Sequence, residues 1–192
     1  MVVKIMKEFL KVKSVNNKVG MWLALILIGF FSVSGSAANE YKVDNTNSTV
    51  TFAGEHVGMV FSGVFEKWEA NIVLPPSTNP TINAMFQLKS AKTGDFTYDS
   101  TLAEGDWFDT KNHPKGRFTS QSVETTSNGY KVTGNLELRG VSKPQTFVLE
   151  RSGNKLKAQF TINRLDYGIG FDSDPTAEWV SRDIVIKLSL QI

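Results

Sequence analysis

Hydrophobic and polar residues alternate along most of the chain beyond residue 40. Over residues 155–162, Leu156, Ala158, Phe160 and Ile162 occupy every second position, and Lys, Gln or Thr fills the positions between them. Successive side chains of a strand point to opposite faces, so this period predicts strands with one apolar and one solvated face. We expect about eight such strands. They cover residues 42–53, 60–74, 81–89, 116–124, 130–139, 145–151, 155–163 and 183–192.

The connections between these runs contain turn-forming residues. Asn128-Gly129 and Ser152-Gly153-Asn154 are hairpin signals, while Pro75-Pro76 and Pro80 mark a longer loop. Strands joined by short turns pair as antiparallel neighbours. Since almost no helix is expected to cover their apolar faces, the sheet must close into a barrel or fold into a sandwich. A barrel of about eight strands is filled by side chains or holds one small ligand, and the periodicity leaves both open.

Residues 93–114 interrupt the strand pattern with the sequence TGDFTYDSTLAEGDWFDTKNHP. Residues 95–103 are expected to form a short helix, and Gly105 and His113-Pro114 favour a loop after it. We interpret this segment as a helix and loop over one barrel opening. Its apolar side chains either form a lid or plug the barrel end, and its acids are expected to face water. The apolar set is Tyr98, Leu102, Trp107 and Phe108, and the acidic set is Asp95, Asp99, Asp106 and Asp109.

The first 38 residues predict export from the cytoplasm. Five lysines precede an apolar run over residues 21–31, and small residues end at Ser36-Ala37-Ala38. This is the pattern of a secretory signal peptide, and the apolar run is shorter than the about 20 residues of a membrane-spanning helix. We predict cleavage after Ala38, which leaves one domain, residues 39–192, in the periplasm or secreted. An uncleaved anchor is the alternative.

Charge and cysteine content exclude several classes of function. The net charge of +2 comes from the leader, because 16 basic and 18 acidic residues remain once its five Lys and one Glu are removed. The predicted mature domain, at a net charge of −2, lacks the basic surface typical of a nucleic-acid-binding protein. Cysteine is absent, which excludes disulfides, thiolate metal ligands and a lipoprotein anchor.

Candidate catalytic chemistry is scarce. The two histidines, His56 and His113, do not have the spacing of a helical metal site, and no GxSxG motif occurs. Glu104 and Asp106 lie among solvated loop residues, which disfavours a catalytic acid pair. We therefore predict that the protein is not an enzyme and binds no metal. A membrane β-barrel would also show alternation, but the polar interruption and the lack of evident aromatic girdles disfavour it.

Three segments resemble the YceI-like family of bacterial periplasmic proteins that bind polyisoprenoid lipids. They are residues 93–114, residues 134–147 with the sequence GNLELRGVSKPQTF, and residues 162–170 with the sequence INRLDYGIG. The resemblance extends over nearly all of the chain after Ala38. It implies an all-β fold, a lipocalin-like antiparallel up-and-down β-barrel with an elongated apolar pocket. It also implies that the protein sequesters or transports an isoprenoid lipid or isoprenoid quinone, with no other cofactor required.

The resemblance also suggests roles for single residues. His56 matches a histidine-glycine pattern that borders the ligand cavity in relatives, so it either hydrogen-bonds a head group or is a structural histidine bonded to backbone. Arg164 matches an arginine shared by the family. We interpret it as a structural clamp on the long loop that follows the predicted helix within residues 93–114, and head-group contact is the second role. On an extended segment, Arg164 and Asp166 would point to the same side and pair. The predicted ligand-binding residues are His56, Phe65, Phe86, Leu102, Trp107, Phe108, Leu136, Phe160, Arg164, Asp166 and Leu188.

Burial energetics favour a long tail over a small solute. Each buried CH₂ contributes about 0.8 kcal/mol, so about ten carbons offset only about 8 of the roughly 4 to 15 kcal/mol that association costs. A chain of several isoprene units binds tightly without a demanding head-group site, and fatty acids or amides compete closely. The alternative is a filled structural barrel that acts as a protein-interaction subunit. A transient membrane or membrane-protein donor and a homodimer remain open as partners.

Overall fold

The computed structural model describes residues 39–192. The predicted leader and its cleavage after Ala38 lie outside the described residues and stay predictions. In chain order the elements are β1 (Asn39–Asp44), β2 (Thr49–His56), β3 (Met59–Phe65), β4 (Trp68–Leu74), β5 (Thr81–Gln87), the 3-10 helix η1 (Leu88–Ser90), β6 (Ala91–Lys92), α1 (Phe96–Leu102), β7 (Lys115–Thr126), β8 (Gly129–Leu138), β9 (Val141–Ser152), β10 (Lys155–Asn163), the 3-10 helix η2 (Arg164–Tyr167) and β11 (Asp183–Gln191). Within residues 39–192, no helix is long and apolar enough to cross a membrane.

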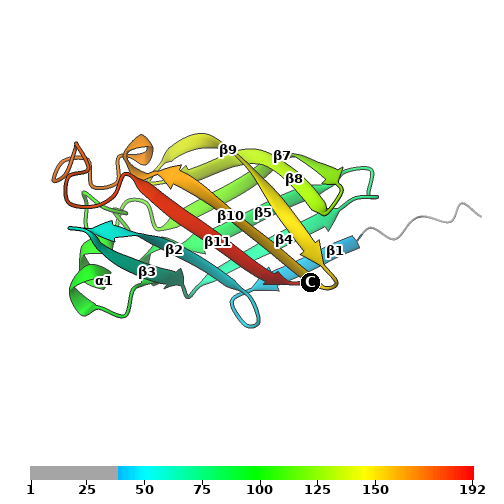
Figure 1. Ribbon diagram of the computed structural model, residues 1–192, viewed down its shortest axis with the longest axis horizontal. Coiled ribbons are helices and arrows are strands. Elements are labelled where there is room, and N and C mark those ends of the chain that lie inside the picture. The colour runs from blue at the N-terminus through cyan, green and yellow to red at the C-terminus, as the bar shows by residue number, and fades with distance from the viewer. Residues whose placement is uncertain (1–38) are drawn as a thin grey trace, which may run out of the picture. The chain divides into compact units, whose positions relative to one another are not determined.

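All the strands belong to one antiparallel sheet that curls around an apolar interior (Figure 1). The strand order is β1-β4-β5-β7-β8-β9-β10-β11-β2-β3-β6. The predicted all-β antiparallel fold with a short helical insertion is therefore confirmed. From β7 to β11 the strands pair in chain order, as in an up-and-down barrel, whereas β1 pairs with β4 and β11 pairs with β2.

The sheet has eleven strands, not the expected eight or so. Two of the predicted runs break at turns, because residues 45–47 form a turn and residues 66–67 form a bend. At the first break, Asp44 Oδ1 accepts a hydrogen bond from Thr46 N (2.8 Å), a local bond that competes with strand pairing. The two-residue strand β6, directly before the polar interruption, is the third addition. Both breaks are visible in the sequence, because residues 44–49 are all polar and the pair Glu66-Lys67 interrupts the alternation, but the expected strand bounds ran across them.

The predicted inward faces are confirmed along the later strands. On β10 the apolar positions are buried or half-buried and the lysines and glutamine between them are exposed. On β8 and β11 the even-numbered Val, Ile and Leu positions likewise face the interior. The predicted helix is also present, because Asp95 Oδ1 accepts hydrogen bonds from Thr97 N and Tyr98 N and so caps the start of α1.

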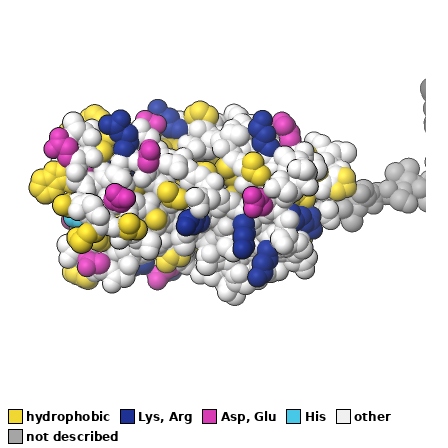
Figure 2. Space-filling model, viewed as in Figure 1, with side chains coloured by type: hydrophobic (Ala, Val, Ile, Leu, Met, Phe, Trp, Pro, Cys, Tyr) yellow, Lys and Arg dark blue, Asp and Glu magenta, His cyan; other side chains and the backbone are white. Residues whose placement is uncertain are grey.

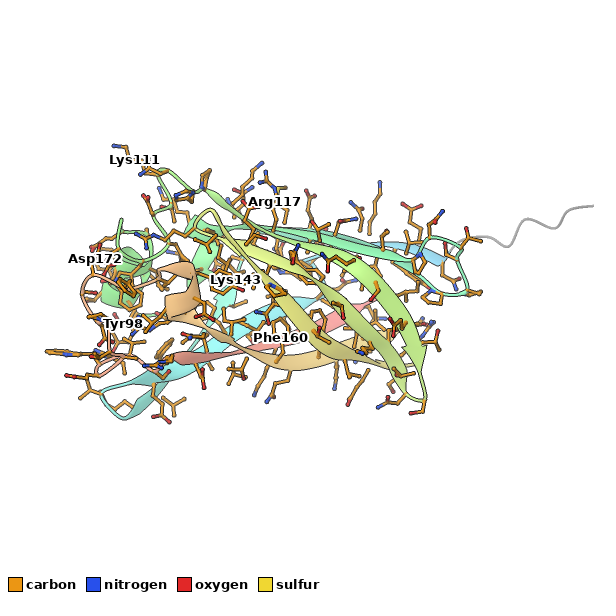
Figure 3. The ribbon with its side chains drawn as sticks, turned by 90° about the horizontal axis from the view of Figure 1, so that it is seen from above. Tyr98, Lys111, Arg117, Lys143, Phe160 and Asp172 are labelled. Atoms are coloured by element: carbon orange, nitrogen blue, oxygen red, sulfur yellow. The ribbon has the colours of Figure 1, made fainter. Side chains whose placement is uncertain are left out.

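The interior is packed tightly at the end of the sheet away from α1. Leu74, Val132, Leu149 and Leu156 there have at most 1% of their surface exposed. In the middle of the sheet, inward side chains such as Phe160 and Leu188 are only half-buried. Figure 3 shows Phe160 midway along the sheet, with Tyr98 and Asp172 at the α1 end. The core is therefore less dense in the middle of the sheet than at that end.

We expect a leucine at the packed end to stabilise the fold more than a leucine in the middle. Leu156→Ala should lower the free energy of unfolding by about 2 to 5 kcal/mol, because it leaves a cavity among fixed neighbours. Leu188→Ala should cost about 1 kcal/mol, because that side chain already borders open space. Urea unfolding of both variants measures the difference, and equal losses would contradict an open interior.

Candidate functional site

An apolar cavity of about 130 Å³ lies inside the curled sheet. That is about ten times the smallest volume that holds one water molecule, which is about 10 to 15 Å³. Nine of the eleven residues predicted to bind ligand lie in its wall. They are Phe65, Phe86, Leu102, Trp107, Phe108, Leu136, Phe160, Arg164 and Leu188. Alternation placed Phe86, Leu136, Phe160 and Leu188 on the inward face, and their strands have that register.

Aromatic rings form much of the cavity wall. Phe147 stacks on Phe160 with 4.6 Å between ring centroids, and Phe118 packs against Phe147 at 5.5 Å. On another part of the wall, Phe65 packs against Phe86 at 5.6 Å. Such contacts add about 0.5 to 1.5 kcal/mol each beyond burial and hold the rings in place. The rings of the wall therefore hold one another in place.

Helix α1 and the long loop after it form the wall at one end of this cavity. Phe108 is buried and its backbone N–H donates to Leu102 O (3.0 Å), which folds the loop back under α1. Gly170 N donates to Asp106 O (2.7 Å), so the long loop is also tied to residues 168–182. The predicted lid residues Leu102, Trp107 and Phe108 all line the cavity.

Asp106 faces water only in part, because it is half-buried and its carboxylate is engaged by another loop. Its carboxylate accepts hydrogen bonds from Asp172 N (2.9 Å) and from the N and Oγ of Ser173 (3.0 and 2.5 Å). Burial raises the pKa of Asp106, but these hydrogen bonds and the charge of Arg139 outweigh it, so the pKa lies below its ordinary value. Asp106 thus joins two loops at the α1 end.

A second pocket of about 260 Å³ lies under α1, and we call it the vestibule. Its wall is His56, Phe61, Thr93, Thr97, Tyr98, Thr101, Leu102, Trp107 and Val180. Four of these residues, Phe61, Leu102, Trp107 and Val180, also line the apolar cavity, so the two spaces adjoin. The vestibule differs from the cavity in carrying hydroxyl groups and a histidine.

His56 lies in the vestibule and contacts a side chain, Tyr98. His56 Nδ1 and Tyr98 OH are 2.8 Å apart, and the two rings meet edge to face. Either atom donates, depending on the histidine tautomer. The predicted border position of His56 therefore matches the structure, and Tyr98, expected only as part of an apolar lid, is its polar partner. Ligand binding by His56 stays a prediction.

The expected pairing of Arg164 with Asp166 is wrong. Residues 164–167 form the 3-10 helix η2, in which positions two apart do not face the same side. Asp166 is exposed, accepts a hydrogen bond from Asn163 Nδ2 (3.0 Å) and lines neither pocket. The partner of Arg164 is Asp174, with Nη2 to Oδ2 at 2.6 Å.

Arg164 is a clamp, but it holds residues 168–182 rather than the long loop. Its Nη1 donates to Ile169 O (2.7 Å), its Nη2 to Val180 O (2.9 Å) and its Nε to Ser181 O (3.2 Å). Its guanidinium carbon lies 5.7 Å from the centre of the Trp107 ring, which is its contact with the long loop. Burial lowers the pKa of Arg164, and Asp174 opposes that shift.

Asp174 and Arg139 are the residues that sequence reasoning missed. Asp174 is buried and accepts hydrogen bonds from Glu178 N (2.8 Å) and Val180 N (2.9 Å) as well as from Arg164. Arg139 ends the predicted polar row of β8 and donates to Gly105 O (2.6 Å) and to Gly168 O. Each residue bonds to a partner in another segment of the chain, and the sequence around it does not indicate which partner that is. Within residues 39–192, no group of three or more His, Asp or Glu side chains is placed to hold a metal ion.

Comparison with known proteins agrees with this architecture. The family model of the YceI-like domain matches residues 41–192. The YceI proteins of Salmonella arizonae and Salmonella paratyphi B are each 26% identical to the chain over 188 residues, covering 90% of the chain and 96% of each relative.

Two solved structures are similar in fold. BcnA of Burkholderia cenocepacia is 24% identical, with a TM-score of 0.70 over 77% of this chain and 98% of BcnA. A polyisoprenoid binding domain from Saccharophagus degradans, implicated in plant cell wall breakdown, is 18% identical, with a TM-score of 0.58 over 80% of this chain and 97% of that domain.

The buried ion pair should make stability depend on pH through Asp174. Burial raises the pKa of Asp174, but backbone N–H groups and Arg164 outweigh it and hold the pKa below its ordinary 3.8. The stabilisation is therefore present above about pH 4 and is lost as pH falls through the lowered pKa. Asp174→Asn should cost about 3 kcal/mol at pH 7, because it leaves Arg164 buried without a counter-charge.

Urea unfolding between pH 7 and pH 3 measures this effect. The difference between the parent chain and Asp174→Asn should shrink below about pH 4. Asp166→Asn, at the exposed carboxylate in the same region, is the matched control and should change stability by less than about 0.5 kcal/mol. A pH-independent difference for Asp174→Asn would contradict the assignment.

Proposed function

This chain belongs to the YceI-like domain family, and we propose that it binds an isoprenoid lipid with its apolar tail inside the sheet. The observation that carries the proposal is the apolar cavity that adjoins a more polar vestibule. The similar fold of a polyisoprenoid binding domain supports the same class of ligand. The filled-barrel alternative fits less well, because inward residues in the middle of the sheet are only half-buried.

We expect the apolar tail of the lipid to supply most of the binding free energy. Each methylene group that leaves water contributes about 0.8 kcal/mol, so a chain of several isoprene units exceeds the cost of association. The cavity wall offers aromatic and aliphatic contacts with little shape specificity. Fatty acids and amides are therefore the competing ligands of the same site.

The vestibule favours an uncharged head group. It offers the hydroxyls of Thr97 and Thr101 and the His56–Tyr98 pair, and no lysine or arginine of the described chain lines it. The nearby Lys92 is paired with Asp99 at 3.5 Å. A quinone carbonyl or an alcohol matches these donors and acceptors, whereas a phosphate would lack a counter-charge. An isoprenoid quinone or a polyprenyl alcohol is the ligand class we propose.

The biological role we propose is to sequester or carry this lipid in the periplasm without covalent chemistry. It depends on the predicted leader, whose small-residue end and apolar run indicate export. The Arg164–Asp174 ion pair is assigned a structural role, because the hydrogen bonds of Arg164 go to protein atoms of residues 168–182.

Filling the cavity should abolish tail binding without unfolding the protein. Leu188→Trp should weaken binding of a geranylgeranyl quinone about a hundredfold or more, because it displaces about four carbons of the tail. Ser189→Trp, on the outward face of the same strand, is the matched control and should bind as the parent chain does. Gel filtration followed by chromatographic quantification of retained quinone measures binding. Equal retention by both variants would reject the cavity as the binding site.

Removing the vestibule hydrogen bonds should affect head-group preference more than overall affinity. His56→Ala and Tyr98→Phe should each weaken quinone binding about twofold to tenfold, the effect of about one hydrogen bond, and leave binding of the matching hydrocarbon unchanged. His113→Ala removes the other histidine, which lies outside both pockets, and is the control. Competition between the quinone and the hydrocarbon measures the preference. An unchanged preference in both vestibule variants would rule out the head-group site.

A further inference from the structure

Exposed apolar side chains are concentrated on three segments of the described chain. Residues 39–192 contain seven large hydrophobic residues that are exposed, and six of them lie in the β2–β3 hairpin, at the start of α1 or in residues 168–182. We call these six the apolar rim. They are Val57, Met59, Val60, Phe96, Phe171 and Trp179. The seventh, Val148, lies on β9.

The three segments meet around the vestibule. Val57 N donates to Trp179 O (2.8 Å), which joins the hairpin to residues 168–182. Phe96 is on α1, whose Tyr98 contacts His56 at the end of β2. Figure 1 places α1, the β2–β3 turn and the segment before β11 at one end of the sheet, and Figure 2 shows hydrophobic side chains gathered at that end. The apolar rim therefore borders the opening of the ligand site.

Two aromatic side chains of the rim are largely exposed to solvent, although burial in the core would be favourable for them. Phe96 is 87% exposed and Trp179 is 63% exposed. Contiguous exposed apolar residues mark interaction surfaces, and tryptophan in particular favours the boundary between lipid and water. Because these side chains surround the opening, any surface that binds them also lies over the ligand site.

We propose that the apolar rim inserts into the surface of a lipid bilayer, so that the ligand passes between the bilayer and the cavity without crossing water. The proposal rests on the proposed function. Moving about ten methylene groups from an apolar environment into water costs about 8 kcal/mol, which lowers the concentration of free lipid in water about a millionfold. Transfer through solution is therefore slow. Direct contact of the rim with the bilayer removes that step.

The charges beside the rim identify the kind of bilayer. Glu55, Asp95, Asp172 and Glu178 are exposed next to rim residues, and Arg182 is an exposed cation near them. Proteins that recognise anionic lipid use clusters of lysine and arginine, which this surface lacks among the described residues. The rim therefore fits a zwitterionic surface, and anionic lipid should weaken the contact.

Sedimentation with vesicles tests the docking directly. The parent chain should bind phosphatidylcholine vesicles, and adding phosphatidylglycerol at low salt should reduce binding at least threefold. Phe96→Ser combined with Trp179→Ser should reduce binding to phosphatidylcholine at least tenfold. Val148→Ser, at the exposed apolar residue outside the rim, is the matched control and should bind as the parent does.

Ligand measurements separate this proposal from the proposed function. The double variant should retain its affinity for geranylgeraniol added from solution within about twofold, yet take up quinone from vesicles at least tenfold more slowly. If the parent binds vesicles but no geranylgeraniol, the proposed function fails and docking stands. Unchanged vesicle binding by the double variant would overturn docking. A parent dimer that the double variant converts to monomer, with no vesicle binding, would show that a second copy covers the rim.

Discussion

The ion pair between Arg164 and Asp174 is the interaction on which the site depends. Nearly all of both side chains is buried, and the guanidinium also donates to carbonyl groups of residues 168–182. A charge without a partner in that position would be costly, so the ion pair and the loop around it form together. The loop carries Val180, which lines both pockets, and Gly170, which is bonded to the long loop at Asp106. One buried ion pair therefore holds in place the loop that borders the cavity opening.

The curled sheet is packed less densely in its middle than at the end away from α1. Side chains are packed fully at the end away from α1, where leucines and Val132 have almost no exposed surface. In the middle, Phe160 and Leu188 line the cavity, and Phe160 stacks on Phe147 in its wall. A filled interior would be more stable, because dispersion contacts are lost wherever a void remains. The open space is therefore a feature that stability alone does not explain.

Most strands and much of the cavity wall could be predicted from the sequence for a simple physical reason. A period of two assigns side chains to faces, so the inward position of Phe86, Leu136 and Leu188 followed from local pattern. A helix over residues 95–103 was also expected, and the structure adds that Asp95 caps its start. The turns that divide the first two runs were missed although the sequence marks them with an all-polar stretch at residues 44–49 and with Glu66-Lys67. The Arg164–Asp174 pair was missed because η2 replaces an extended segment, and no spacing rule connects a residue to a loop carboxylate ten positions away.

The central claim is that the open interior exists to hold an isoprenoid lipid. Mass spectrometry of an organic extract tests it most directly, on the protein isolated from its own cells without detergent, beside an unrelated exported protein. We expect a prenyl quinone or prenyl alcohol at close to one molecule per chain and none in the control. A protein that carries no lipid and takes up no added quinone would contradict it.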